Sequence, residues 1–255
     1  MLSINKRKYL KSLNNKKHRL IEKKVLIEGL RIIDEGISSG LNFEHIWISN
    51  RYDKHSVIYL NLIKKIKTCD IPYTFEIDKD IQFISNTKNS QGIVALLIVD
   101  NLFNENLHFF SDKIVILDRI SDPGNLGTII RTCAWFGITS LILTKSSADI
   151  FNPKCLRSSM GGHFYIDNCI YLSNKKIVDF ISLHKYKIYC SSMEGKSIYN
   201  LERNDKWALI LGSEAHGINE ELLVGEKITI PKKGSIESLN VSIASGIMLD
   251  YLTRG

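Results

Sequence analysis

Apolar and polar positions alternate with two different spacings in the first half of the chain. Residues 16–39 and 57–66 place apolar side chains along one helical face, so both segments predict helices. Strand-like patterns occupy residues 43–48, 72–77 and 92–99. Residues 100–111 break the pattern and are rich in Asn, which indicates the end of an N-terminal domain that we place at residues 1–104.

The second half, residues 105–255, alternates continuous apolar runs with helical patterns more regularly. The apolar runs predict strands at 114–117, 141–143, 207–211 and 228–230. The helical patterns lie at 125–136, 174–183 and 239–252. Apolar strands that alternate with helices are typical of a mostly parallel sheet covered on both faces. We therefore expect an α/β fold in which ligands bind at the carboxyl ends of the strands.

Composition restricts the class of protein. A chain of 255 residues with 44% hydrophobic and 24% charged residues is ordinary for one large or two small globular domains. The longest apolar run, Ile93 to Val99, is too short to cross a bilayer, so we expect no membrane partner. Five cysteines with no C-x-x-C spacing argue against a disulfide framework or a thiolate zinc site, and favour a cytoplasmic location.

The positive charge is concentrated at one end of the chain. The net charge is +7, and residues 1–24 contain nine Lys or Arg and one acid. Such a basic arm favours a polyanionic partner such as RNA. A solubilising and partly disordered tail explains the same charge equally well. An anionic membrane surface fits less well because the arm lacks a continuous apolar face.

The first segment with possible chemistry runs from Asp118 to Gly127 and is followed by Arg131. It begins at the end of a predicted strand and enters a helix that Asn125 is able to cap. Arg131 lies six residues further on, about 240° around the helix, so the two side chains do not share a face. An ordinary turn, a cap and a surface arginine remain the alternative interpretation.

The second segment, Leu211 to Gly217, follows the apolar strand 207–211. Its sequence L-G-S-E-A-H-G places glycines on both sides of Glu214, which suits a loop whose backbone approaches a ligand closely. A turn with Glu214 near a helix N-terminus is the alternative.

The third segment runs from Ile230 to Ala244. A strand ends at a proline, a glycine loop follows, and Ser238 is expected to open the last helix as its N-cap. Asn240 in a first helical turn is unusual from propensity alone, so we expect it to face a ligand.

Together these segments resemble a known family. The motifs N-L-G-x-x-x-R, G-S-E-x-x-G and I-P…S-L-N-V-S-x-A, in that order, resemble the SpoU/TrmH family of RNA ribose 2′-O-methyltransferases in the SPOUT superfamily, over about residues 112–255. The stretch N-P-K-x-x-R-S-S-M-G, at 152–161, also resembles the family; it is either a phosphate contact for RNA or a helix with a glycine C-cap. Residues 1–99 more weakly resemble the family's small substrate-binding domain.

The resemblance implies a fold, a cofactor and a set of site residues. It implies a C-terminal parallel-sheet SPOUT domain with a deep trefoil knot, preceded by a small α/β ribosomal-protein-like RNA-binding domain. The methyl donor would be S-adenosylmethionine, with no metal, and the protein would be a homodimer whose active site lies at the interface. The implied donor contacts are Leu211, Gly212, Ile230 and Leu239. The implied active-site residues are Asn125, Arg131, Glu214, Ser238 and Asn240.

The implied reaction is attack of a ribose 2′-hydroxyl on the donor's methyl group. The family arginine that matches Arg131 is usually assigned as the base, but a guanidinium stays protonated in proteins. Arg131 therefore acts either as a base or as a ligand for an RNA phosphate and the developing alkoxide. Glu214 would hold Arg131 or a backbone amide. Ribosomal RNA of the 23S type is favoured over tRNA because relatives with this extra domain mostly act there.

Two other functional classes make different predictions about the motifs. An RNA-binding or ribosome-assembly protein without catalytic activity predicts lesions at the motif positions, and we see none. A nucleotide-dependent α/β enzyme predicts a phosphate loop, and neither G-x-x-x-x-G-K-[ST] nor G-x-G-x-x-G is present.

Overall fold

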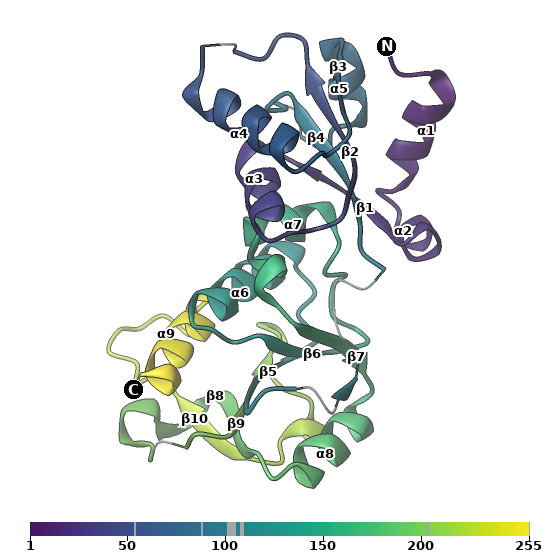
Figure 1. The fold of residues 1–255 in the computed structure, drawn as a ribbon. Coiled ribbons are helices and arrows are strands. Elements are labelled where there is room, and N and C mark those ends of the chain that lie inside the picture. Colours follow the sequence, from purple (N-terminus) through teal and green to yellow (C-terminus); the bar gives the residue numbers. More distant parts are fainter. Residues whose placement is uncertain (54, 88, 101–105, 108–109, 203, 255) are drawn as a thin grey trace. The chain divides into compact units, whose positions relative to one another are not determined.

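The computed structural model describes the chain apart from residues 54, 88, 101–105, 108–109, 203 and 255. The described residues form two compact units (Figure 1). One unit contains residues 1–102 and 151–164, and the other contains residues 103–150 and 165–255. The boundary that the sequence predicts between residues 104 and 105 lies outside the described residues.

The first unit is built on a four-stranded sheet in the order β1-β4-β2-β3. Its strands are β1 (Lys24–Glu28), β2 (Phe43–Ser49), β3 (Tyr73–Glu76) and β4 (Ile93–Ile98). Strand β4 runs antiparallel to β1 and β2, whereas β2 and β3 are parallel. Its helices are α1 (Ile4–Ser12), α2 (Lys16–Glu22), α3 (Leu30–Ser38), α4 (Val57–Thr68), α5 (Asp78–Ile84) and α7 (Pro153–Ser159).

Both faces of this sheet are covered by helices because alternate strand residues face opposite sides. On β4, Ile93 and Ala95 pack with the buried residues of α3 and α4, while Val94 and Leu96 pack with those of α1 and α5. Leu156 of α7 belongs to the first of these cores. Residues 151–164 therefore pack with the N-terminal unit, although the sequence places them within the C-terminal half.

The second unit contains a six-stranded sheet in the order β10-β8-β9-β5-β6-β7, and all its pairings are parallel. Its strands are β5 (Lys113–Asp118), β6 (Ser140–Thr144), β7 (Asn168–Leu172), β8 (Lys187–Ser197), β9 (Trp207–Gly212) and β10 (Glu226–Thr229). Its helices are α6 (Pro123–Trp135), α8 (Asn174–Leu183) and α9 (Val241–Thr253), with 3₁₀ turns η3 (Ile198–Asn200) and η4 (Glu220–Leu222). A further 3₁₀ turn, η2 (Gly162–Tyr165), lies where the chain passes from one unit to the other.

The predicted mixed α/β fold with a parallel sheet is confirmed. The knot that the family resemblance implies stays a prediction. The helix predicted over 16–39 is wrong, because Lys24–Glu28 forms β1 between α2 and α3. Three consecutive buried residues, Val25 to Ile27, serve both faces of the sheet, and such a run matches helical spacing by chance. Within the described residues no helix is long and apolar enough to cross a bilayer.

The basic arm of residues 1–24 is folded into the first unit. Leu10 and Leu13 are almost completely buried against Leu26, Trp47 and other residues of the sheet. Most of its basic side chains also have partners within the unit: Lys6 and Lys24 with Glu44, Arg7 with Asp80, Lys11 with the Ser85 carbonyl, Arg19 with the Leu13 carbonyl, and Lys23 with Asp100. The interpretation of this arm as a disordered tail is therefore wrong.

Candidate active site

The three motif segments lie at the carboxyl ends of strands in the parallel sheet of the second unit. The first follows β5 and enters α6, the second follows β9, and the third follows β10 and enters α9. Asp118, the last residue of β5, pairs with Gly212, the last residue of β9. Strand order reverses between these two neighbours, the position where open parallel sheets bind ligands.

A single carboxylate oxygen joins all three segments. Glu214 Oε1 accepts hydrogen bonds from Asn125 Nδ2 at 2.9 Å and from Asn240 Nδ2 at 2.8 Å. Asn240 Nδ2 also donates to Asn125 Oδ1 at 3.1 Å. We call Asn125, Glu214 and Asn240 the Asn–Glu–Asn cluster. Residues separated by up to 115 positions thus meet at one solvent-facing point.

The cluster also stabilises the start of α9. Asn240 is the N-cap, and its Oδ1 accepts from the Ser242 amide at 2.9 Å. The Val241 amide donates to Glu214 Oε1 at 3.2 Å, so a carboxylate lies at the positive end of the helix dipole. Ser238 is therefore not the N-cap, as the sequence predicted. Asn240 takes that place, and the backbone of the two preceding residues stays outside the helix.

A similar correction applies to α6. Its N-cap is Asp122, whose Oδ1 accepts from the Asn125 amide at 2.9 Å, and Pro123 occupies the first helical position. Asn125 consequently lies within the first turn, where its side chain is available to Glu214. An acid before a proline at a helix start is a known N-terminal signature, and it predicts Asp122 from sequence.

Two predicted active-site residues are not part of the Asn–Glu–Asn cluster. Arg131 lies on α6, about 9 Å along the helix axis from Asn125 by helix geometry. Its side chain is exposed and makes no hydrogen bond or ion pair with any residue that the structure describes. The same holds for the Ser238 side chain. Glu214 thus holds a backbone amide, one of the two roles expected of it, and has no contact with Arg131 within the described residues.

The predicted donor contacts differ in exposure. Leu211 is completely buried in β9, and Ile230 is half-buried at the end of β10. Leu239 is 44% exposed, and every residue from 231 to 240 is exposed. An exposed loop with an apolar side chain at its end offers both backbone polar groups and an apolar surface to a ligand.

Gly212 is restricted by the chain itself. A Cβ built on it would lie 2.2 Å from the carbonyl carbon of Gly217 and 2.4 Å from the nitrogen of Ile218. The sequence predicts a close backbone approach at this glycine, and in the structure the loop that follows β9 makes such an approach. That loop is closed by a hydrogen bond from the Gly217 amide to the Ser213 carbonyl at 2.8 Å.

The helix α7 carries the basic stretch that follows Asn152. Asn152 is its N-cap, and the helix ends at Met160 in a left-handed conformation, followed by Gly161 with φ of 94°. The C-cap is thus a methionine rather than the expected glycine. Contact of this stretch with RNA stays a prediction.

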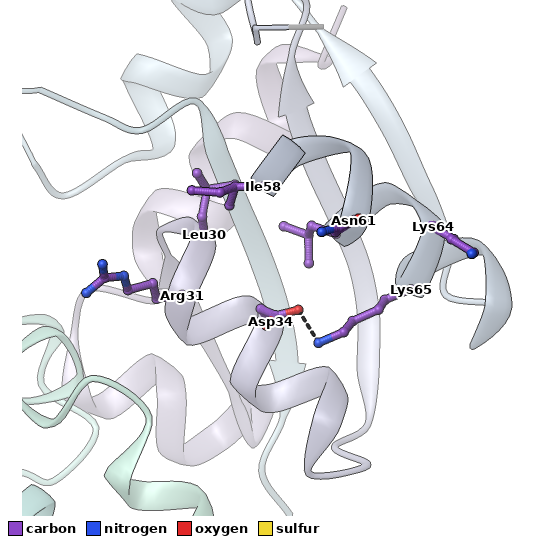
Figure 2. Close-up of a pocket in the computed structure, with 8 residues that line it drawn as sticks. Leu30, Arg31, Asp34, Ile58, Asn61, Lys64 and Lys65 are labelled. Atoms are coloured by element: carbon purple, nitrogen blue, oxygen red, sulfur yellow. Dashed lines mark hydrogen bonds and ion pairs between the residues drawn. The ribbon is translucent and has the colours of Figure 1, made fainter. Parts of the chain in front are cut away.

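Other places in the described residues offer less chemistry. No three His, Cys, Asp or Glu side chains gather to hold a metal ion in this part of the chain. A groove of about 470 Å³ lies between α3 and α4 of the first unit. Figure 2 shows Leu30 and Ile58 together at one end and the ion pair of Lys65 with Asp34 at the other. Lys65 Nζ lies 2.6 Å from Asp34 Oδ1. None of the motif residues lines this groove.

Comparisons with known proteins match both halves of the chain. The SpoU rRNA Methylase family matches residues 112–250, and the MRM3-like substrate binding domain matches residues 5–95. The chain is 29% identical to the 23S rRNA (guanosine(2553)-2′-O)-methyltransferase RlmP of Bacillus subtilis, over 95% of this chain and 93% of that protein.

Solved structures match over nearly the whole length. A TrmH-family protein from Porphyromonas gingivalis is 29% identical, with a TM-score of 0.83 over 99% of this chain and 98% of that one. An AdoMet-bound rRNA methyltransferase from Sinorhizobium meliloti has the same fold at 24% identity, with a TM-score of 0.83 over 99% of this chain and 96% of that one.

Proposed function

Because the chain belongs to the SpoU rRNA methylase family, we propose that it transfers a methyl group from S-adenosylmethionine to a ribose 2′-hydroxyl of ribosomal RNA. The family match confirms the resemblance of the three motifs. The observation that carries the proposal is the convergence of those motifs on Glu214 at the carboxyl ends of β5 and β9. The Bacillus subtilis relative is named for the same reaction on 23S rRNA, which supports both this substrate class and a cytoplasmic location.

We assign donor binding to the loops after β9 and β10. Leu211 and Gly212 would form one wall of the donor pocket. Ile230 and Leu239 would contribute backbone polar groups and apolar surface to it. The exposed Leu239 side chain fits a ligand with an aromatic base. When bound, S-adenosylmethionine supplies a methyl group on a positively charged sulfur. The structure of an AdoMet-bound relative of the same fold supports this donor.

Arg131 in this proposal stabilises charge and does not act as a base. A guanidinium stays protonated in proteins and so is not able to accept the hydroxyl proton. Arg131 is exposed and has no cationic or anionic partner among the described residues, so its guanidinium is available to RNA. It would bind an RNA phosphate and stabilise the negative charge that develops on the 2′-oxygen, while solvent water takes up the hydroxyl proton.

The Asn–Glu–Asn cluster would fix the positions of the three motif segments relative to one another. It links the start of α6, which carries Arg131, to the start of α9 and the loop after β9. Ser238 has an exposed hydroxyl two residues before the N-cap of α9, and we propose that it orients the ribose.

Methylation of ribosomal RNA by the full chain tests the proposal. The chain is incubated with labelled S-adenosylmethionine and ribosomal RNA, and 2′-O-methyl nucleotides are mapped by mass spectrometry. Arg131→Ala should lower turnover by about 10²–10³-fold with little change in donor affinity. Lys176→Ala, an exposed cation on α8, is the matched control and should retain activity.

The pH dependence of Arg131→Lys distinguishes the two roles of the arginine. A base role predicts partial recovery that increases with pH, because a desolvated lysine is able to lose its proton. The proposed phosphate grip predicts little recovery at any pH, since a lysine lacks the two-pronged donor geometry. Normal turnover in Arg131→Ala would contradict both roles. RNA binding without methylation by the wild-type chain would favour the non-catalytic alternative.

We also propose that the N-terminal unit selects the RNA. Its match to a substrate-binding domain supports this assignment. Lys8 and Lys17 are exposed, and their side chains have no partner among the described residues, so they are available to phosphates. Lys8→Gln with Lys17→Gln should weaken RNA binding and flatten its log–log salt dependence by about one unit per lost contact. An unchanged slope would exclude these lysines. Deletion of residues 1–24 is unsuitable, because it also removes Leu10 and Leu13 from the core.

We further propose that the protein is a homodimer. The packed helices α6 and α9 and the loop before α9 carry large exposed apolar side chains: Trp135 (84% exposed), Ile236 (71%), Ile243 (55%) and Leu239 (44%). Apolar surface of this kind is typical of an interaction site. Light scattering should give about twice the chain mass of 29.1 kDa. A monomer that methylates RNA at the full rate would contradict the dimer.

A further inference from the structure

Arg119 follows β5 in an unusual backbone conformation. Its φ is 55°, in the left-handed region that residues with long side chains seldom adopt. Its amide donates to Thr144 Oγ1, at the end of the neighbouring strand β6, at 2.9 Å. Strained backbone conformations of this kind cluster at functional sites, where surrounding contacts stabilise them.

The side chains of Asp118 and Arg119 form hydrogen bonds with the backbone of the loop after β9. Asp118 is 1% exposed, and its Oδ2 accepts from the Asn219 amide at 2.8 Å and from Arg119 Nε at 3.2 Å. Arg119 Nη2 donates to the Gly217 carbonyl at 3.3 Å. We call this pair of residues the Asp118–Arg119 clasp. It binds the backbone of the loop at two positions, 217 and 219.

The clasped backbone belongs to the same turn as Glu214. The turn is closed by the Gly217 amide on the Ser213 carbonyl and by the His216 amide on Ser213 Oγ, at 2.8 and 3.1 Å. Its first end is fixed by Gly212 in β9, and its second end is fixed by the clasp. Glu214 lies between these two fixed ends, where its carboxylate reaches Asn125, Asn240 and the start of α9.

We propose that Asp118 and Arg119 are positioning residues that hold the Glu214 turn in place for methyl transfer. This inference rests on the proposed function of the site. The buried carboxylate orients the guanidinium, and the guanidinium holds the Gly217 carbonyl. Arg119 makes both contacts from its left-handed backbone conformation. A glycine would adopt this conformation without strain but would leave the Gly217 carbonyl without its side-chain donor.

Two substitutions separate the side chain of Arg119 from its backbone. Arg119→Gly removes the guanidinium and relieves the left-handed strain. Arg119→Lys keeps the charge but is unable to bridge Asp118 and the Gly217 carbonyl in the same fork geometry. Lys185→Gly is the matched control, because Lys185 has φ of 56° and is exposed at the turn between α8 and β8. We expect Arg119→Gly to lower kcat by about 10- to 100-fold with KM for RNA nearly unchanged, Arg119→Lys to recover only part of the loss, and Lys185→Gly to retain normal kcat.

A double-mutant cycle shows whether Arg119 acts through Glu214. Measured in a Glu214→Ala background, Arg119→Gly should have little further effect on kcat, because the side chain that it positions is already lost. Full additivity of the two losses would overturn the positioning role, as would a normal kcat in Arg119→Gly.

Hydrogen exchange tests the clasp independently of activity. The amides of residues 213–219, Asn219 above all, should exchange faster in Arg119→Gly and Asp118→Asn than in the wild-type chain or Lys185→Gly. Unchanged exchange in both clasp variants would overturn the clasp. If exchange changes as expected but the wild-type chain methylates no RNA, the proposed function fails while the clasp remains.

Discussion

Replacing Gly212 with alanine tests the close backbone packing on which the candidate site depends. The added Cβ would lie 2.2 Å from the carbonyl carbon of Gly217, whereas ordinary van der Waals contact begins at 3.4 Å. The two backbone segments must therefore separate by about 1.2 Å, because neither neighbouring atom belongs to a flexible side chain. That movement displaces the turn that carries Glu214.

The expected cost follows from this overlap. Forcing an extra carbon into a packed region costs about 1–3 kcal/mol. For a chain of this size that lowers the melting temperature by roughly 2–12 °C. Loss of the Glu214 contacts should lower turnover by about 100-fold, since a displacement of about 1 Å in a site has effects of this order.

Thermal unfolding, donor titration and turnover measure these effects together. Gly246→Ala is the control for stability, because a Cβ at this position in α9 meets only Thr132 Cγ2, at 3.9 Å. It should leave the melting temperature unchanged or raise it slightly, as alanine favours helices. A Gly212→Ala protein with the melting temperature and turnover of the wild type would contradict the close packing of Gly212 against Gly217.

Three further outcomes follow from burial and charge. Leu10→Ala should destabilise the N-terminal unit by about 2–5 kcal/mol, because Leu10 is completely buried; unchanged unfolding in urea would mean that α1 is not docked. Burial, and secondarily Lys6, lowers the pKa of His45 below its usual 6.5. The unfolded chain therefore binds the proton more readily, so stability is full above pH 6.5 and falls as the pH decreases through the folded-state pKa. His45→Gln should reduce this acid sensitivity in melting curves, and an identical pH profile would contradict it. A thiol reagent should modify only the exposed Cys69 in the native chain and all five cysteines in denaturant; burial raises the pKa of Cys133 to about 12, so rapid native labelling there would contradict its packing.

Much of the C-terminal unit follows from local sequence. Its apolar runs are long enough and its helical faces regular enough that α8 spans 174–183 as predicted, and β5, α6, β9 and α9 begin and end within two residues of their predicted bounds. Strands β7 and β8 were missed. Strand β7 mixes polar and apolar residues, and β8 ends in an irregular polar stretch where its register with β10 shifts. Such segments become strands by pairing with neighbouring strands, so the spacing of apolar residues within the segment does not predict them.

The candidate site shows the same division between local and distant information. The sequence alone indicates which segments form the candidate site, because their motifs resemble those of the family that matches residues 112–250. Which atoms of these segments meet depends on how the chain folds. Helix caps depend on which backbone amides remain unpaired, and this placed Asp122 and Asn240 where Asn125 and Ser238 were expected.

The N-terminal arm gives the clearest physical contrast. Its charge is a property of composition and is visible from the sequence, but whether a cation is available to RNA depends on which carboxylates and carbonyls surround it after folding. Arg7 forms a hydrogen bond with the buried Asp80, 73 positions away. Arg19 is buried and donates to the Leu13 carbonyl. The clasp of Asp118 and Arg119 is of the same kind, since its acceptor at Gly217 lies 98 residues from its donor. Contacts between residues so distant along the chain are set by the parallel pairing of β5 with β9, and local patterns carry no record of that pairing.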